Sequence, residues 1–344
     1  MNNTIPPMRP EPDRDGYGRY RLPDPTTGRT RSWTRATTVV GALKDLNGLI
    51  GWKRRKVAEG LAARPELLTS IPDIAAQIEA AGDDWRAAKD AKAAFDALCD
   101  EAATAAGADK GSQAGTQAHT LTEYADAGRL DEVRHLATES ELADLHAYTV
   151  AMDAAGILRP AEYVERIIIC SATDSAGTLD RLVRMPDGRL LVADVKSQQS
   201  IDFGFMEICC QLAQYANADG MFTDDGHLEP MPADLDKTTG LVMHVPVGKA
   251  TCDLYEIDLV EGWEAAKTAH QVRTLRSRSK AMGRRFVPPA TASTAVDQDL
   301  YLIRNATHPD ALVALWRDLS ARGCWTELHT QTAATRKAQL AAAS

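Results

Sequence analysis

The sequence predicts a mixed α/β protein with helical regions on both sides of a central β-rich part. Apolar residues recur at helical spacing through most of the first third, and again towards the C-terminus. Between them lie five short β-branched segments bounded by Gly, Pro, Asp and Thr. At 344 residues, with 44% hydrophobic and 25% charged residues, the chain can bury the core of one large domain and a smaller one.

The N-terminal third is expected to be helical after an irregular start of thirty-odd residues. Helical periodicity covers residues 37–68 and residues 84–106. A glycine-rich joint, GADKGSQAG, then precedes another helical pattern, TQAHTLTEYADAG, which a glycine closes. Two further helices are expected over residues 130–136 and 140–155.

Five predicted strands form the centre of the chain. Their sequences are AEYVERIIIC, GTLDRLVRM, RLLVADVKS, TGLVMHVPV and CDLYEIDL. Between the third and the fourth, the apolar positions of FGFMEICCQLAQYANA suit a helix that packs on the sheet.

The C-terminal part is expected to be a small helical appendage. A helix over residues 260–281 is followed by VPPATASTAV, whose composition is typical of a linker. Two short helices broken at Gly323 end the chain. The predicted organisation is an N-terminal helical region packed on the core (1–110), a core (111–285), a linker (286–297) and a helical appendage (298–344).

Composition excludes several classes of protein. The net charge of −9 and the pI near 5.4 argue against a protein that coats nucleic acid by bulk charge. Two basic stretches, WKRRK and RTLRSRSKAMGRR, either form a local basic groove or are solvated helix faces. No apolar run approaches the about eighteen residues of a membrane span, and the polar, Pro-rich start is not a secretion signal. These features predict a cytoplasmic protein that does not bind a membrane.

The six cysteines indicate neither a disulfide framework nor a metal cluster. They lack CxxC spacing and are most simply reduced core residues. We therefore expect no zinc or iron–sulfur site.

One predicted hairpin, GTLDRLVRMPDGRLLVADVKS, carries residues suited to chemistry. Because side chains alternate along a strand, Asp194 and Lys196 share a face with Leu190 and Val192. With Pro186–Gly188 as a three-residue loop, Asp180 lies opposite Asp194, with β-carbons about 5 Å apart. A two-residue Asp-Gly turn would instead place Asp180 opposite Val195, and the sequence leaves both registers open.

In the first register, two like charges face each other beside apolar side chains, so they need compensation. A hard divalent cation takes oxygen ligands and would supply it, with Lys196 beside the metal to stabilise a charged transition state. The alternative is a solvent-facing hairpin whose Asp and Lys form a weak surface pair.

Four motifs in order resemble the PD-(D/E)XK nuclease superfamily, specifically its RecB-type and phage exonuclease branch. They are GTQAH in a helix, GTLD on one strand, ADVK on the next strand and QLAQY on the following helix, and they cover about residues 111–218. The resemblance implies a restriction-endonuclease-like core, in which helices flank a mixed central sheet. It also implies that His119, Asp180 and Asp194 bind Mg²⁺ or Mn²⁺, together with the Val195 carbonyl.

The resemblance further assigns catalytic roles. Lys196 resembles the catalytic lysine, and Gln211 and Tyr215 resemble the Q-x-x-x-Y pair of the RecB-type branch. Gln211 and Tyr215 are four residues apart on one helix, as are His119 and Glu123, so each pair shares a helix face. Glu165 is either an additional carboxylate of the site or, as we expect, an outward-facing structural residue.

The implied activity is metal-dependent hydrolysis of DNA phosphodiester bonds by an exonuclease of recombination, repair or replication, as in phage-encoded enzymes. Its substrate would be double-stranded DNA ends or single strands, in a bacterial or phage-infected cell. A recombinase or a single-strand-binding protein is the kind of partner that such an enzyme implies. The cysteines that hold an iron–sulfur cluster in some RecB-type relatives are absent. Two rivals are a catalytically silent nuclease fold that binds DNA or protein, and an assembly protein that acts through its helical ends.

Overall fold

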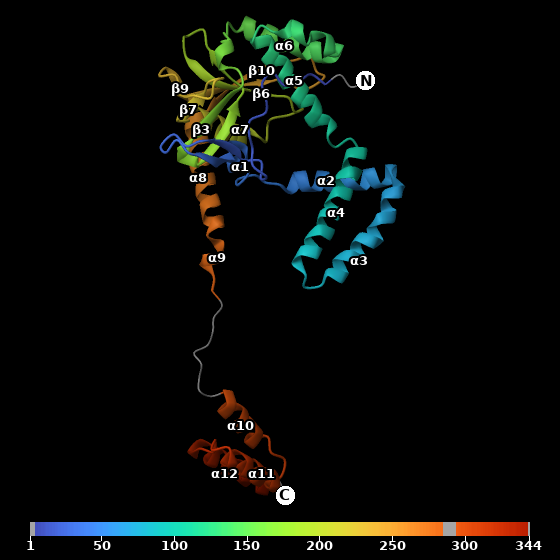
Figure 1. Cartoon of the computed structure of the whole chain (residues 1–344), viewed down its shortest axis with the longest axis vertical. Coiled ribbons are helices and arrows are strands. Elements are labelled where there is room, and N and C mark those ends of the chain that lie inside the picture. Colours follow the sequence, from blue (N-terminus) through green and yellow to red (C-terminus); the bar gives the residue numbers. More distant parts are fainter. Residues whose placement is uncertain (1–3, 285–293, 343–344) are drawn as a thin grey trace. The chain divides into compact units, whose positions relative to one another are not determined.

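The computed structural model describes residues 4–284 and 294–342 (Figure 1). Contacts divide the chain into two compact units, Met1–Ser277 and Arg278–Ser344. Among the described residues there are twelve α-helices and ten strands, which confirms the mixed α/β class. The finer division of the first unit near residue 110 stays a prediction.

The strands form two mixed sheets where the sequence analysis expected one. The larger sheet has the order β1-β2-β4-β3-β7-β8, with β2 and β4 parallel and the other neighbours antiparallel. Its strands are β1 (Tyr20–Pro23), β2 (Thr30–Arg35), β3 (Arg166–Cys170), β4 (Ser175–Leu179), β7 (Gly220–Phe222) and β8 (Leu228–Pro230).

The smaller sheet has the order β10-β9-β6-β5, with β6 and β9 parallel. Its strands are β5 (Arg181–Arg184), β6 (Leu190–Lys196), β9 (Leu235–His244) and β10 (Asp253–Asp258). The segment predicted as one strand, GTLDRLVRM, is therefore two strands in different sheets. The break falls at Asp180.

Two predictions about the strands were wrong. The start of the chain, expected to be irregular, contains β1 and β2, and the short strands β7 and β8 were missed. The sequence TRSWTR of β2 has little apolar alternation, so its strand conformation depends on pairing with β4, which lies far along the chain.

The N-terminal helices form an arm that extends from the sheets (Figure 1). They are α1 (Ala36–Val40), α2 (Asn47–Ala63), a 3₁₀ helix (Pro65–Ser70), α3 (Ile71–Ala81) and α4 (Trp85–Ala105). Helix α3 was not predicted. The helices α2 and α4 touch at Gly60, where a β-carbon would lie 1.6 Å from the Ala102 carbonyl oxygen. Only glycine permits this approach.

Helix α5 (Lys110–Asp126) begins inside the predicted joint, so most of that joint is helical. The helix expected over residues 130–136 is instead a pair of 3₁₀ turns, and α6 (Glu139–Ala154) begins with a capping box at Thr138. Helices α7 (Phe205–Ala216) and α8 (Leu259–Ser277) match the predicted helices.

The two faces of β6 pack into different cores. Leu190 and Val192 lie in the cluster that contains the apolar face of α7. Leu191, Ala193 and Val195 lie in the cluster with side chains of α5 and α6. The alternation read from the sequence is confirmed, and the strand is buried on both sides.

The second unit is helical: α9 (Ser279–Met282), α10 (Thr294–Arg304), α11 (Pro309–Ala321) and α12 (Glu327–Ala342). The break predicted at Gly323 is confirmed, because this residue has φ +69° between α11 and α12. Residues 286–293 of the predicted linker lie outside the described residues. Residues 294–297 belong to α10, so the linker prediction was wrong there. No helix within the described ranges is long and apolar enough to cross a membrane.

Candidate metal and catalytic centre

The hairpin has the register that places the two aspartates opposite each other. Arg181 pairs with Ala193, and the Met185 N–H donates to the Arg189 carbonyl at 2.9 Å. One step further along the ladder, Asp180 faces Asp194. The three-residue turn is thus confirmed, and the two-residue alternative was wrong.

Asp180 lies where the chain leaves one sheet for the other. Its Oδ2 atom accepts a hydrogen bond from the Val195 N–H at 3.0 Å and lies 3.2 Å from Nδ1 of His119 on α5. The residue is 9% exposed. The break in the strand therefore turns a carboxylate towards the neighbouring strand and towards α5.

Asp194 and Lys196 point the same way from β6, as predicted. Nζ of Lys196 lies 2.6 Å from Oδ2 of Asp194, and Asp194 is 2% exposed. The angles at this contact are not those of a hydrogen bond, and this buried oxygen has no hydrogen-bond partner. A weak surface pair, the alternative reading of the hairpin, is excluded by this burial.

The buried charges shift one another's pKa values. Burial would raise the pKa of Asp180, but the charge and hydrogen bond of His119 outweigh it and lower that pKa. Burial and the charge of Asp180 raise the pKa of Asp194 above its usual range. Burial would lower the pKa of Lys196, but the charges of Asp194 and Asp180 raise it. Two facing carboxylates therefore behave differently because one has the closer cation.

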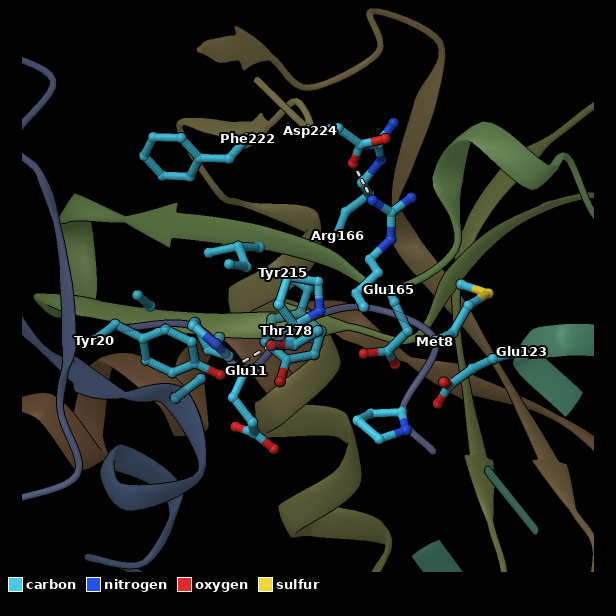
Figure 2. A pocket seen from close by; sticks show the side chains of 18 of the residues that line it. Met8, Glu11, Tyr20, Glu123, Glu165, Arg166, Thr178, Tyr215, Phe222 and Asp224 are labelled. Carbon is cyan, nitrogen blue, oxygen red and sulfur yellow. Dashed lines mark hydrogen bonds and ion pairs between the residues drawn. The ribbon is translucent and has the colours of Figure 1, made fainter. Parts of the chain in front are cut away.

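Two further carboxylates join this cluster. Glu123 lies on α5 one turn after His119, and Glu165 precedes β3 with φ +53°. Burial and the neighbouring charges of Glu123 and Asp180 raise the pKa of Glu165 to about 9. The expectation that Glu165 faces outward was wrong, because its carboxyl hydrogen-bonds that of Glu123 and lines the cavity shown in Figure 2.

Helix α7 brings the glutamine and the tyrosine of its motif together. Nε2 of Gln211 donates to the Tyr215 hydroxyl at 2.9 Å, and the tyrosine is 2% exposed. A β-carbon at Gly177 would lie 2.7 Å from Cε1 of Tyr215. The glycine of the GTLD motif therefore makes room for the ring.

The glycine of the GTQAH motif has a similar role. A β-carbon at Gly115 would lie 2.7 Å from Oγ of Ser197, the residue after β6. Because α5 approaches the end of β6 this closely, His119 reaches Asp180.

A buried arginine next to the site was not found from the sequence. Arg181 is fully buried and hydrogen-bonds Tyr148 at 2.7 Å and Thr122 at 3.0 Å, and it pairs with Asp126. A possible signal was a charged residue at a position of the strand pattern that otherwise alternates apolar side chains.

The donor set suits a hard divalent cation, although the side chains do not surround one. Within residues 4–284 and 294–342, no three His, Cys, Asp or Glu side chains are grouped as metal ligands are. The carboxylates are engaged by His119 and Lys196 instead. Carboxylate oxygens with one imidazole are ligands for Mg²⁺ or Mn²⁺, and the buried Asp194 oxygen without a hydrogen bond is available to one. The role of the Val195 carbonyl stays a prediction, because the contact observed to Asp180 is from the Val195 N–H.

The comparisons add no relative. No protein-family model matches the chain, and no curated protein sequence matches it.

Proposed function

We propose that this protein is a divalent-metal-dependent nuclease that hydrolyses DNA phosphodiester bonds, an exonuclease resembling the RecB-type and phage branch of the PD-(D/E)XK superfamily. The observation that carries the proposal is the arrangement on one hairpin of Asp180 opposite Asp194, with the Lys196 ammonium 2.6 Å from Asp194. Such an exonuclease would act in recombination, repair or replication.

The chain's residues would divide the work as follows. His119, Asp180 and Asp194 would hold Mg²⁺ or Mn²⁺, which when bound polarises the scissile phosphate and lowers the pKa of a bound water. Lys196 would turn from Asp194 to the phosphate once a metal neutralises that carboxylate. Its fixed positive charge then stabilises the negative charge that develops in the transition state.

Gln211 and Tyr215 would have different roles. Tyr215 is too buried to touch DNA, so its hydroxyl positions the Gln211 side chain. Gln211 is half-buried and lines both of the cavities beside the centre, where its amide can contact the strand being cut.

The test is digestion of end-labelled linear DNA and closed circular DNA with Mg²⁺, Mn²⁺ or EDTA. We expect loss of linear DNA with either metal, none with EDTA, and intact circles. The Asp194→Asn variant, which keeps the shape of the side chain but not its charge, should be inactive with every metal. Equal degradation by this variant would show that a contaminant or another site cuts the DNA.

One observation favours a second candidate, a binding module without chemistry. Asp180 and Asp194 already have cationic partners in His119 and Lys196, so their burial does not require a metal. Titration with Mn²⁺ separates the two candidates: the module predicts no binding at the centre, and the nuclease predicts binding that Asp194→Asn abolishes.

A further inference from the structure

Two cavities flank the proposed centre and meet at it. The larger, of about 750 Å³, is lined by Glu123, Glu165 and Tyr215, and the smaller, of about 310 Å³, is lined by Lys196. Gln211 lines both. The cavities are thus two parts of one passage that runs past the catalytic lysine.

Residues 5–14, here called the strap, form one wall of the larger cavity. At one end Ile5 is buried, and its N–H donates to Oε1 of Gln117 on α5 at 3.0 Å. Further along, Arg9 pairs with Asp224 in the turn between β7 and β8. Figure 2 shows Met8 on the same side of the cavity as Glu123. The strap therefore spans the passage from α5 to the far end of the larger sheet.

The strap is stiff. It contains four prolines, Pro6, Pro7, Pro10 and Pro12, whose rings fix the backbone and favour an extended chain. An extended, stiff segment loses less conformational entropy when it is held across a gap. The strap closes the passage into a ring without helix or sheet.

The chemistry of the walls suits a nucleic acid strand. Five arginines line the larger cavity, and four of them are paired with carboxylates: Arg9 and Arg166 with Asp224, Arg14 with Glu11, and Arg129 with Glu132. The fifth, Arg35, is exposed, and no side-chain partner is found for it among the described residues. In the smaller cavity, the exposed side chains Leu46 and Leu49 offer apolar contact to bases.

We propose that this passage binds a single strand of nucleic acid, and that the strap admits only a strand with a free end. The inference rests on the proposed function for its substrate class. Cavities of about 300–1,000 Å³ hold drug-sized groups, the scale of a few nucleotides, whereas the major groove alone of a duplex is about 12 Å wide. A closed circle cannot be threaded through a ring, so the requirement for an end would come from the strap.

The test measures binding in EDTA, so that it does not depend on cleavage. The probes are a linear single strand, the same strand closed into a circle, and the linear strand with a streptavidin bound at each end. We expect the full chain to bind the free linear strand at least about tenfold tighter than the other two. Equal affinity for all three, or no affinity for any, would overturn the inference.

A shortened chain tests the strap itself. A chain that begins at Asp13 lacks residues 1–12 but keeps the Asp13 carbonyl, which accepts from the Arg21 N–H at 2.9 Å. It should bind linear strand and circle within about threefold of each other. Should the loss of Ile5 unfold it, the streptavidin-capped strand still decides with the full chain. Linear strand that binds but is not cut with any metal would refute the nuclease and leave the passage intact.

The unpaired guanidinium of Arg35 gives a matched pair of variants. Arg35→Gln should weaken binding of the linear strand and reduce the slope of log K against log salt by about 0.7, the value for one phosphate contact with a single strand. Arg29→Gln removes an exposed arginine that lines neither cavity, and should change neither quantity. The same effect in both variants would mean that the passage does not hold the strand.

Discussion

Replacing Lys196 with methionine should destabilise the metal-free protein because it leaves the Asp194 carboxylate buried without its cation. Nζ of Lys196 lies 2.6 Å from that carboxylate, and the side chains are 17% and 3% exposed. Breaking a buried pair by removing one partner costs about 3–5 kcal/mol, whereas an exposed pair contributes at most about 1 kcal/mol. For a domain with an unfolding free energy of about 5–15 kcal/mol, the loss is large.

The effect should depend on pH. Burial and Asp180 already hold the pKa of Asp194 above its usual range, and removal of Lys196 raises it further. A carboxyl with a raised folded-state pKa loses stability as pH rises from its unfolded value, about 3.9, through the folded one. The cost of Lys196→Met should therefore be small near about pH 4 and largest near about pH 8.

Urea unfolding in EDTA at several pH values measures this cost. Lys237→Met is the control, since Lys237 is exposed on β9 of the same sheet, and it should change the unfolding free energy by less than about 0.5 kcal/mol. The double variant with Asp194→Asn should recover most of the loss, because no unpaired carboxylate remains. A cost below about 1 kcal/mol for Lys196→Met at pH 8 would refute a buried pair. In single-turnover cleavage with metal, the same variant should be slower by roughly a hundredfold.

Three other variants test separate parts of the structure. Asp180→Asn or Asp194→Asn should abolish Mn²⁺ binding and cleavage while thermal unfolding stays cooperative; calorimetry that gives wild-type affinity would contradict the assigned ligands. Gly177→Ala should lower the unfolding free energy by about 1–3 kcal/mol, because its β-carbon would lie 2.7 Å from the ring of Tyr215; unchanged stability would mean that the ring moves freely. A chain that ends at Ser293 should unfold cooperatively and keep nuclease activity, since Arg278–Ser344 is a separate unit; loss of cooperative unfolding would assign the last helices to the core.

The hairpin could be predicted because its determinants are local. The turn residues Pro186 to Gly188 and the two-residue period of a strand together fix which side chains face each other. The contact of Asp194 with Lys196 follows from the same period, and the contact of Gln211 with Tyr215 follows from the helical one. Each of these pairs is close in sequence or separated by one turn.

The features that were missed depend on segments distant in the chain. The strand β2 pairs with β4 across about 140 residues, and its own sequence gives little sign of it. The inward position of Glu165 depends on α5, which supplies Glu123. The split of the predicted strand at Asp180 depends on two sheets that recruit its halves separately. No periodicity within one segment carries this information.

The break at Asp180 also explains how α5 is held against the centre. Asp180 contacts His119, and the next residue, Arg181, contacts Thr122 and Asp126 of the same helix. Consecutive residues of the hairpin thus reach two different sets of α5 side chains. The buried arginine fixes the helix, and with it the histidine. A variant that loosened the arginine network would be expected to disturb the metal site without touching a ligand, because the same helix carries both.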